Sequence, residues 1–156
     1  DWGDTPAYFT GQLVGGFTGA VVCWLAYKLQ FDAQTDKINT VGIFSTGPTV
    51  RNYFWNVVTE IIGTFALVLW ILLNPKENAA LGYAAVAFVV IGIGASLGGP
   101  TGYAINPARD LGPRIAHALL PIRGKASSDW PYAWVPVAGP LLGAAAAGGL
   151  FHILPG

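Results

Sequence analysis

The sequence contains no methionine, a single cysteine and very little charge. A chain without methionine is not a complete translation product, so we expect these 156 residues to be the later part of a longer protein. Cys23 excludes an intrachain disulfide, because there is no second thiol to pair with it. The 8 basic and 8 acidic residues balance. Because Lys and Arg form no cluster, the sequence indicates no nucleic-acid partner.

Residues that hold metals or cofactors are also scarce. The two histidines, His117 and His152, are far apart in the sequence and have no neighbours at metal-ligand spacing. The sequence has no phosphate-binding loop and no nucleophile elbow. We therefore expect no metal, no cofactor and no enzymatic activity.

Apolar residues dominate what is present. Hydrophobic residues make up 53% of the chain and charged residues 10%, which is typical of an all-α membrane protein. A single membrane domain, residues 1–156, is predicted. The apolar stretches are long enough for four spanning helices, at about 8–29, 53–73, 79–96 and 132–154. The polar, turn-rich residues 31–52 form a surface loop.

Residues 92–114 bring glycine, proline and polar residues into this apolar chain. The Asn106-Pro107 pair is a good helix start, because the Asn side chain caps free amides and Pro loses only a donor without a partner. Pro121 limits the helix to about 106–120, roughly 22 Å, which is short of a ~30 Å hydrocarbon core. Non-helical backbone at membrane depth must be buried in protein or line a wet cavity. A re-entrant half-helix at a pore or binding site is predicted.

Three charged residues in these apolar surroundings need an explanation. Arg109 lies in the first turn of the half-helix, where the helix dipole disfavours a cation, so a group outside the helix must require its guanidinium. Asp110 is favoured there by the same dipole and needs only a structural role. Glu60, inside the second span, should face protein or water. We expect it to brace the structure, with proton or ion handling as the alternative.

The residues around this half-helix resemble a known family. Gly102-Tyr103-Ala104, Asn106-Pro107-Ala108-Arg109-Asp110 and Gly112-Pro113-Arg114 are similar to the second Asn-Pro-Ala signature of the major intrinsic proteins, the aquaporin superfamily. The resemblance covers the whole chain, from the third membrane helix of the family onward. It implies an aquaporin-like right-handed helical bundle of six spans and two half-helices, of which four spans and one half-helix are here. It also implies a multi-pass protein of the cell membrane (plasma or inner), with residues 31–52 outside the cell.

Three positions make the sequence similar to the glycerol facilitator, or aquaglyceroporin, branch of this family. Asp110 follows the arginine where water-selective members usually carry Ser. Gly94 stands where those members carry His, and Tyr103 is aromatic where they carry a small residue. Many glycerol facilitators have Phe at the last position, so the Tyr103 hydroxyl is a departure that could narrow the filter or add a hydrogen bond.

The resemblance implies roles for these residues. Arg109, Tyr103 and Gly94 would form the selectivity filter, in which the arginine donates to solute hydroxyls, the ring faces the carbons and the glycine leaves room. The backbone carbonyls of Gly102, Tyr103 and Ala104 would accept hydroxyl protons. Asn106, with Pro107 and Ala108, would present an amide donor at the pore centre, and Glu60 and Asp110 would give structural support.

The function implied is a passive channel for glycerol, other small polyols and water that excludes ions and protons. The resemblance also implies a homotetramer in the lipid bilayer, with one pore in each subunit. An ion-coupled secondary transporter, with Glu60 or Asp110 binding a proton or Na⁺, is the alternative. An intramembrane hydrolase using Asp110 and His117 is a third, without a recognisable Ser or Cys nucleophile. The first Asn-Pro-Ala signature and its filter aromatic are not in this sequence.

Overall fold

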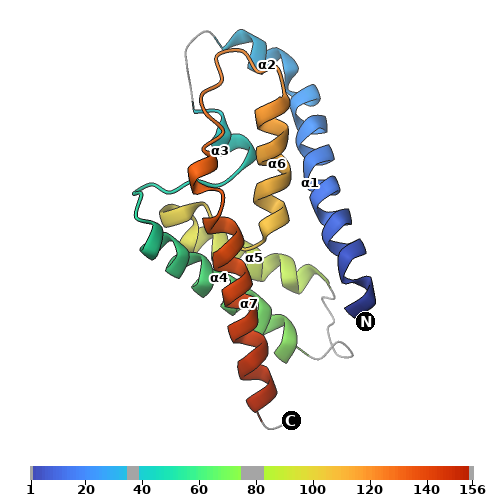
Figure 1. Ribbon diagram of the computed structural model, residues 1–156, viewed down its shortest axis with the longest axis vertical. Coiled ribbons are helices and arrows are strands. Elements are labelled where there is room, and N and C mark those ends of the chain that lie inside the picture. The colour runs from blue at the N-terminus through green and yellow to red at the C-terminus, as the bar shows by residue number, and fades with distance from the viewer. Residues whose placement is uncertain (1, 35–38, 75–82, 155–156) are drawn as a thin grey trace. The chain divides into compact units, whose positions relative to one another are not determined.

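The computed structural model describes residues 2–34, 39–74 and 83–154, and the regular elements in these ranges are helices (Figure 1). The longer ones are α1 (Thr5–Ala26), α4 (Tyr53–Leu73), α5 (Tyr83–Thr101), α6 (Pro107–Leu119) and α7 (Val135–Ile153). The shorter ones are α2 (Lys28–Ala33), α3 (Val41–Phe44) and 3-10 turns at Trp2–Asp4 and Trp130–Tyr132. Among the described residues, 4 helical segments are long and apolar enough to cross a membrane: Trp2–Ala26, Tyr53–Leu73, Tyr83–Thr101 and Trp130–Ile153.

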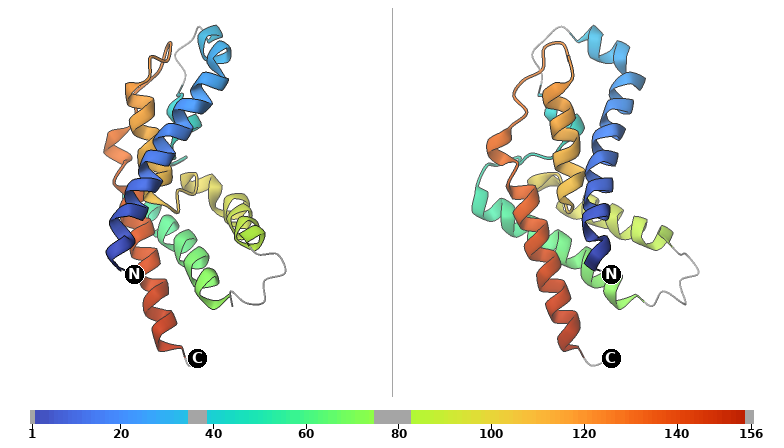
Figure 2. Two further views of the ribbon diagram at one scale, coloured as in Figure 1. Left: turned by 90° about the vertical axis from the view of Figure 1, so that its right-hand side faces the viewer. Right: turned by 45° about the vertical axis from the view of Figure 1, so that its right-hand side comes forward.

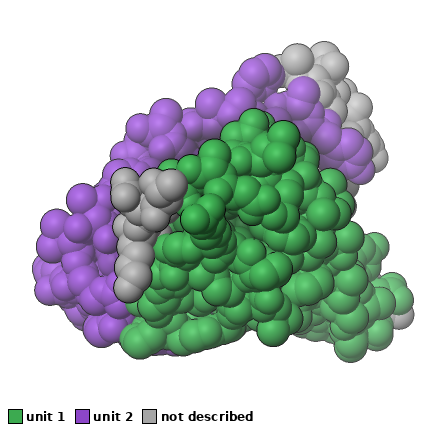
Figure 3. All heavy atoms as spheres, turned by 90° about the horizontal axis from the view of Figure 1, so that it is seen from above, with its two compact units in different colours: residues 1–47, 107–133 green, residues 48–106, 134–156 purple. Residues whose placement is uncertain are grey.

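The chain divides into two compact units, coloured separately in Figure 3. The first unit comprises residues 1–47 and 107–133, and the second comprises residues 48–106 and 134–156. In the first unit α6 packs along α1, and in the second α7 packs against α4, as the two views of Figure 2 show. Each unit is described by itself below.

Glycines allow the helices of the first unit to approach closely. A Cβ added at Gly112 of α6 would lie 2.8 Å from the Leu13 carbonyl oxygen, and one at Gly16 of α1 would lie 2.9 Å from the Ala108 carbonyl oxygen. Both contacts are with backbone, so a larger residue would force the helices apart. Beside this crossing, an apolar cluster is formed by Ala20, Phe31, Phe44, Ala116 and Ile122.

Glycines also allow close helix packing in the second unit. A Cβ added at Gly139 of α7 would overlap the Cβ of Glu60, and one at Gly143 would lie 2.5 Å from the Ile61 carbonyl oxygen. The start of α4 is capped by Asn52, whose side chain accepts a hydrogen bond from the Trp55 N–H at 3.2 Å. These glycines bring the α7 backbone directly against the helix that carries Glu60.

The helix bounds differ from the predicted ranges in several places. α5 continues past Ser96 to Thr101 because Thr49 satisfies its last carbonyls: its N–H donates to Pro100 and its hydroxyl to Gly99. The first helix ends at Ala26 rather than near residue 29, and α2 follows it. The short helix α3 lies within the predicted loop. Residues 79–82, where the third span was predicted to begin, lie outside the described residues, whereas α4 coincides with its predicted range.

Candidate functional site

The half-helix α6 begins at Pro107, directly after Asn106, in agreement with the prediction from the Asn-Pro pair. It has 13 residues, so it is about 20 Å long, too short to cross a ~30 Å hydrocarbon core. Asp110 lies in its first turn, and Arg109 precedes it.

Glu60 of α4 is bonded to the segment that precedes the half-helix. Its Oε1 accepts hydrogen bonds from the Thr101 hydroxyl at 2.7 Å and the Ala104 N–H at 2.9 Å. Its Oε2 accepts one from the Ile105 N–H at 2.8 Å. The Glu60 side chain is only 1% exposed, and both of its oxygens have donors. These hydrogen bonds hold residues 101–105 against α4, which is the contact pattern of a structural residue.

The segment held by Glu60 has an unusual backbone. Gly102, Tyr103 and Ile105 have φ angles of 80°, 43° and 45°. Side-chain-bearing residues rarely adopt this left-handed region, so the surrounding contacts must maintain it. In a trans peptide the C=O points opposite to the N–H. Because the N–H groups of Ala104 and Ile105 point toward Glu60, the carbonyls of Tyr103 and Ala104 point away from it.

The Tyr103 ring lies against α5. A Cβ added at Gly94 would be 2.9 Å from Cζ of this ring and 3.1 Å from its Cε2. Separations below about 3 Å are too short for carbon atoms in van der Waals contact, which prefer 3.5 to 4.0 Å. Any larger residue at position 94 would therefore displace the ring, so Gly94 and Tyr103 form one steric unit.

Arg109 is exposed and lies in the first unit. Its Nη1 donates to the Phe44 carbonyl oxygen at 3.3 Å. The residue lines a cavity of about 430 Å³, together with Gly16, Gly19, Ala20, Cys23, Ile43, Phe44 and Pro113. The guanidinium is thus not sealed into a dry core.

Asp110 is fully buried and pairs with Arg114, which is also fully buried. Arg114 Nε donates to Asp110 Oδ1 at 2.7 Å, and its Nη2 donates to Oδ2 at 3.0 Å. The same Oδ2 accepts from the N–H and hydroxyl of Thr46 at 2.8 and 2.6 Å. Arg114 was missed as a site residue, although its spacing of four from Asp110 on a helix is a signal for an ion pair.

Arg114 also binds three backbone carbonyls. Its Nη1 donates to Ser128 at 2.7 Å and Asp129 at 3.1 Å, and its Nη2 donates to Thr46 at 2.7 Å. The segment at Thr46, which precedes α6 in the sequence, and the segment at 128–129, which follows it, are therefore both bonded to the Arg114 guanidinium. Because Phe44, the partner of Arg109, is two residues from Thr46, this network also positions the contact that orients Arg109.

His117 lies farther along α6 and is fully buried. Its Nε2 shares a hydrogen bond with the Thr40 hydroxyl at 2.7 Å and its Nδ1 shares one with the Ser128 hydroxyl at 2.8 Å. Lys125 closes the end of the same helix by donating to the carbonyls of His117, Ala118 and Leu120. These contacts tie His117 to the surrounding loops.

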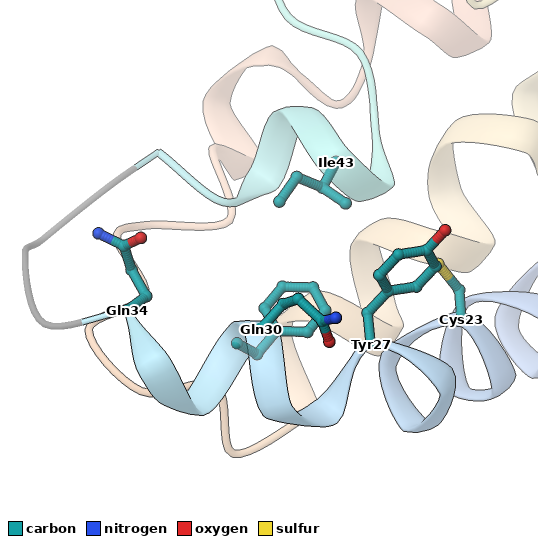
Figure 4. Close-up of a pocket in the computed structure, with 6 residues that line it drawn as sticks. Cys23, Tyr27, Gln30, Gln34 and Ile43 are labelled. Carbon is teal, nitrogen blue, oxygen red and sulfur yellow. The ribbon is translucent and has the colours of Figure 1, made fainter.

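A second cavity of the first unit, about 460 Å³ in volume, lies between the end of α1, α2 and α3. Figure 4 shows Tyr27, Gln30 and Ile43 around it. The remaining lining residues are Cys23, Phe31 and Gln34. None of the lining side chains carries a formal charge.

The predicted site residues fall into two groups. Gly94, Tyr103 and Glu60, together with Gly102, Ala104 and Asn106, belong to the second unit. Pro107, Ala108, Arg109 and Asp110 belong to the first. Within the second unit the structure brings Glu60, the 102–105 backbone and Gly94 together around Tyr103. Within the first it brings Asp110 and Arg114 together beside Arg109.

These features define a class of protein. It is a multi-pass helical membrane protein with a half-helix that begins directly after a non-helical segment. The chain belongs to the major intrinsic protein family, which it matches over residues 3–152. The family resemblance and the all-α membrane fold predicted from the sequence are thereby confirmed. Membership of this channel family removes the intramembrane hydrolase from the alternatives.

Two curated relatives are about half identical to this chain over the matched residues. It is 52% identical over 156 residues to glycerol uptake facilitator protein 3 of Lactiplantibacillus plantarum, with 99% of this chain and 65% of the relative covered. It is 51% identical over 153 residues to the glycerol uptake facilitator protein of Bacillus subtilis, with 97% and 56% covered. The chain thus spans 56% to 65% of the length of these relatives.

A solved structure shows the same fold. The aquaglyceroporin from Plasmodium falciparum superimposes with a TM-score of 0.76 at 25% sequence identity. The match covers 99% of this chain and 69% of that one.

Proposed function

We propose that this protein is a passive transmembrane channel for glycerol, related small neutral solutes and water that excludes ions and protons. The observation that carries the proposal is the Tyr103 ring seated directly on Gly94, with the following backbone braced by Glu60. An aromatic wall beside a position without a side chain suits a solute that has a C–H face. The names of the curated relatives support the same solute class.

Each site residue has a role in this proposal. Arg109 donates to solute hydroxyls, and the carbonyls of Gly102, Tyr103 and Ala104 accept hydroxyl protons. Asn106 contributes an amide donor at the start of the half-helix, where the positive end of the dipole disfavours cations. Glu60 and Asp110 act as structural support, which their hydrogen bonds to backbone and to Arg114 favour.

Solute uptake into proteoliposomes containing the complete protein tests this function against the ion-coupled alternative. A channel equilibrates glycerol at a rate that does not depend on a proton or Na⁺ gradient. Accumulation of glycerol above its equilibrium level, driven by either gradient, would overturn the channel proposal and favour a transporter.

Replacement of Arg109 with Val should weaken both solute selection and the barrier to protons, because it removes a fixed cation and its fork of donors. We expect the permeability ranking of polyols to flatten and proton leak to rise. The measurements are stopped-flow light scattering and a pH-sensitive dye trapped in vesicles. Unchanged leak together with an unchanged ranking would contradict a filter role for Arg109.

Placing His at Gly94 should reduce glycerol flux more than water flux. The new Cβ would lie 2.9 Å from Cζ of Tyr103, so the ring must move and the imidazole must occupy the room that glycerol needs. Gly99→His is the matched control, because a Cβ there meets nothing within 4 Å. Equal losses of glycerol and water flux in Gly94→His would count against the size argument.

We further propose that the protein is a homotetramer with one pore in each subunit. Large apolar side chains are exposed on α4 and α5, two of the spanning helices of the second unit, among them Phe54, Ile62, Phe88 and Ile91. Such surfaces suit contact with lipid or with another subunit. Native mass spectrometry of the detergent-solubilised protein should find four copies, and a monomer under mild conditions would overturn this assembly.

A further inference from the structure

The Tyr103 ring rests on two glycines of α5. Besides its contact with Gly94, the ring lies beside Gly98, where an added Cβ would be 3.2 Å from Cδ1 and 3.5 Å from Cε1. Residues four apart on a helix lie on the same face. Gly94 is therefore beneath the hydroxyl end of the ring, and Gly98 is beneath the edge closer to the backbone.

The backbone that carries this ring is held on both sides. Before Tyr103, the Gly102 N–H donates to the Gly98 carbonyl at 2.8 Å. After it, the next two N–H groups are bonded to Glu60. A Cβ added at Gly98 would thus meet a ring whose backbone cannot retreat without breaking these bonds. The ring itself must rotate away from α5.

We infer that Gly98 is a second specificity-determining residue, which acts by setting how far the Tyr103 ring stands off α5. The inference rests on the proposed channel function. A methyl group at position 98 lies between the helix and the ring. It therefore narrows the channel by displacing the Tyr103 ring, and not by its own contact with the solute. The permeability of a solute that fills the passage falls more than that of water, and a longer polyol loses more than glycerol does.

The test compares Gly98→Ala with Gly92→Ala in proteoliposomes that contain the complete protein. Both substitutions add one methyl group to α5 and raise its helix propensity equally, but a Cβ at Gly92 meets nothing within 4 Å. We expect Gly98→Ala to lower the glycerol-to-water permeability ratio at least about threefold and to lower the erythritol-to-water ratio further. Gly92→Ala should leave both ratios at the parent values. Equal ratios in the two variants would overturn the inference.

A double-mutant cycle with Tyr103→Ala identifies the route of the effect. Without the ring, Gly98→Ala should have no further effect on the ratio. An effect of the same size in the absence of the ring would overturn the ring mechanism. If Gly98→Ala alone fails to fold, recovery of folded protein in the double variant supports the same steric contact, and failure of the double variant as well overturns it.

Failure of the proposed channel function can be distinguished from failure of the inference about Gly98, because it appears in the parent protein before any variant is compared. A parent protein with no glycerol flux above that of protein-free vesicles would overturn the proposed function. A conducting parent whose ratio is unchanged by Gly98→Ala would overturn only the role of Gly98.

Discussion

Replacement of Arg114 with Met should destabilise the protein by about 3 to 5 kcal/mol, because it leaves the buried Asp110 carboxylate without its counter-charge. Both side chains are fully buried, and Arg114 Nε lies 2.7 Å from Asp110 Oδ1. The substitution also removes the donors to the carbonyls of Thr46, Ser128 and Asp129. The measurement is the unfolding midpoint of the purified protein in detergent.

Two comparisons show whether the buried charge is the cause. Arg123→Met removes an exposed arginine that donates one long bond, 3.4 Å, to the Asp32 carbonyl, so we expect a change within about 0.5 kcal/mol. The double variant Asp110→Asn with Arg114→Met removes both charges and should be more stable than Arg114→Met alone. A midpoint for Arg114→Met equal to that of Arg123→Met would refute the argument.

Replacement of Glu60 with Ala should abolish solute selection and destabilise the protein by about 3 kcal/mol or more, because three hydrogen bonds to a charged acceptor are lost. Two of them hold the N–H groups of Ala104 and Ile105 beside residues with left-handed φ angles. Without the carboxylate these two N–H donors lose their acceptor, and the strained backbone can relax. The carbonyls of Tyr103 and Ala104 would then lose their direction.

Two milder substitutions, Thr101→Val and Glu60→Gln, serve as controls for Glu60→Ala. Thr101→Val removes only the hydroxyl donor at 2.7 Å and should have a small effect on the glycerol-to-water permeability ratio. Glu60→Gln should be intermediate, because its amide group places one donor against a backbone N–H. The alternative role for Glu60, ion binding, predicts a different result: Glu60→Gln would abolish a gradient-dependent flux while the unfolding midpoint stayed constant.

Features that depend on neighbouring residues could be predicted from the sequence. The start of α6 followed from the Asn-Pro pair, and its length followed from Pro121. Comparison of that length with the bilayer thickness showed that the helix is too short to span. The range of α4 followed from an apolar run between Asn52 and Asn74. By contrast, α5 was predicted to end at Ser96 because glycines and a proline follow. The distant Thr49 supplies the donors that let it continue.

Partners that are distant in the sequence could not be predicted in this way. Glu60 was expected to need a partner, but Thr101 is 41 residues away in the sequence. Asp110 was expected to be structural, but its bond to Thr46 joins residues 64 apart. No periodicity or capping rule connects such positions, because only the packing of helices brings them together. Gly98 is a similar case: its importance depends on a ring that folds back over α5.

The sequence by itself determined that this is a helical membrane protein with a half-helix at about residues 106–120, observed at 107–119, and a cation, Arg109, in its first turn. Span length, helix start and helix end are set by local propensity and by hydrophobicity, both of which can be read residue by residue. Only the tertiary structure decided which backbone groups Glu60 holds, that Thr46 also binds Asp110 and which glycines lie beneath Tyr103. The physical reason is that a buried polar group bonds to the groups that lie next to it in space, and a side chain packs against them. Neighbours in space can be far apart in the sequence.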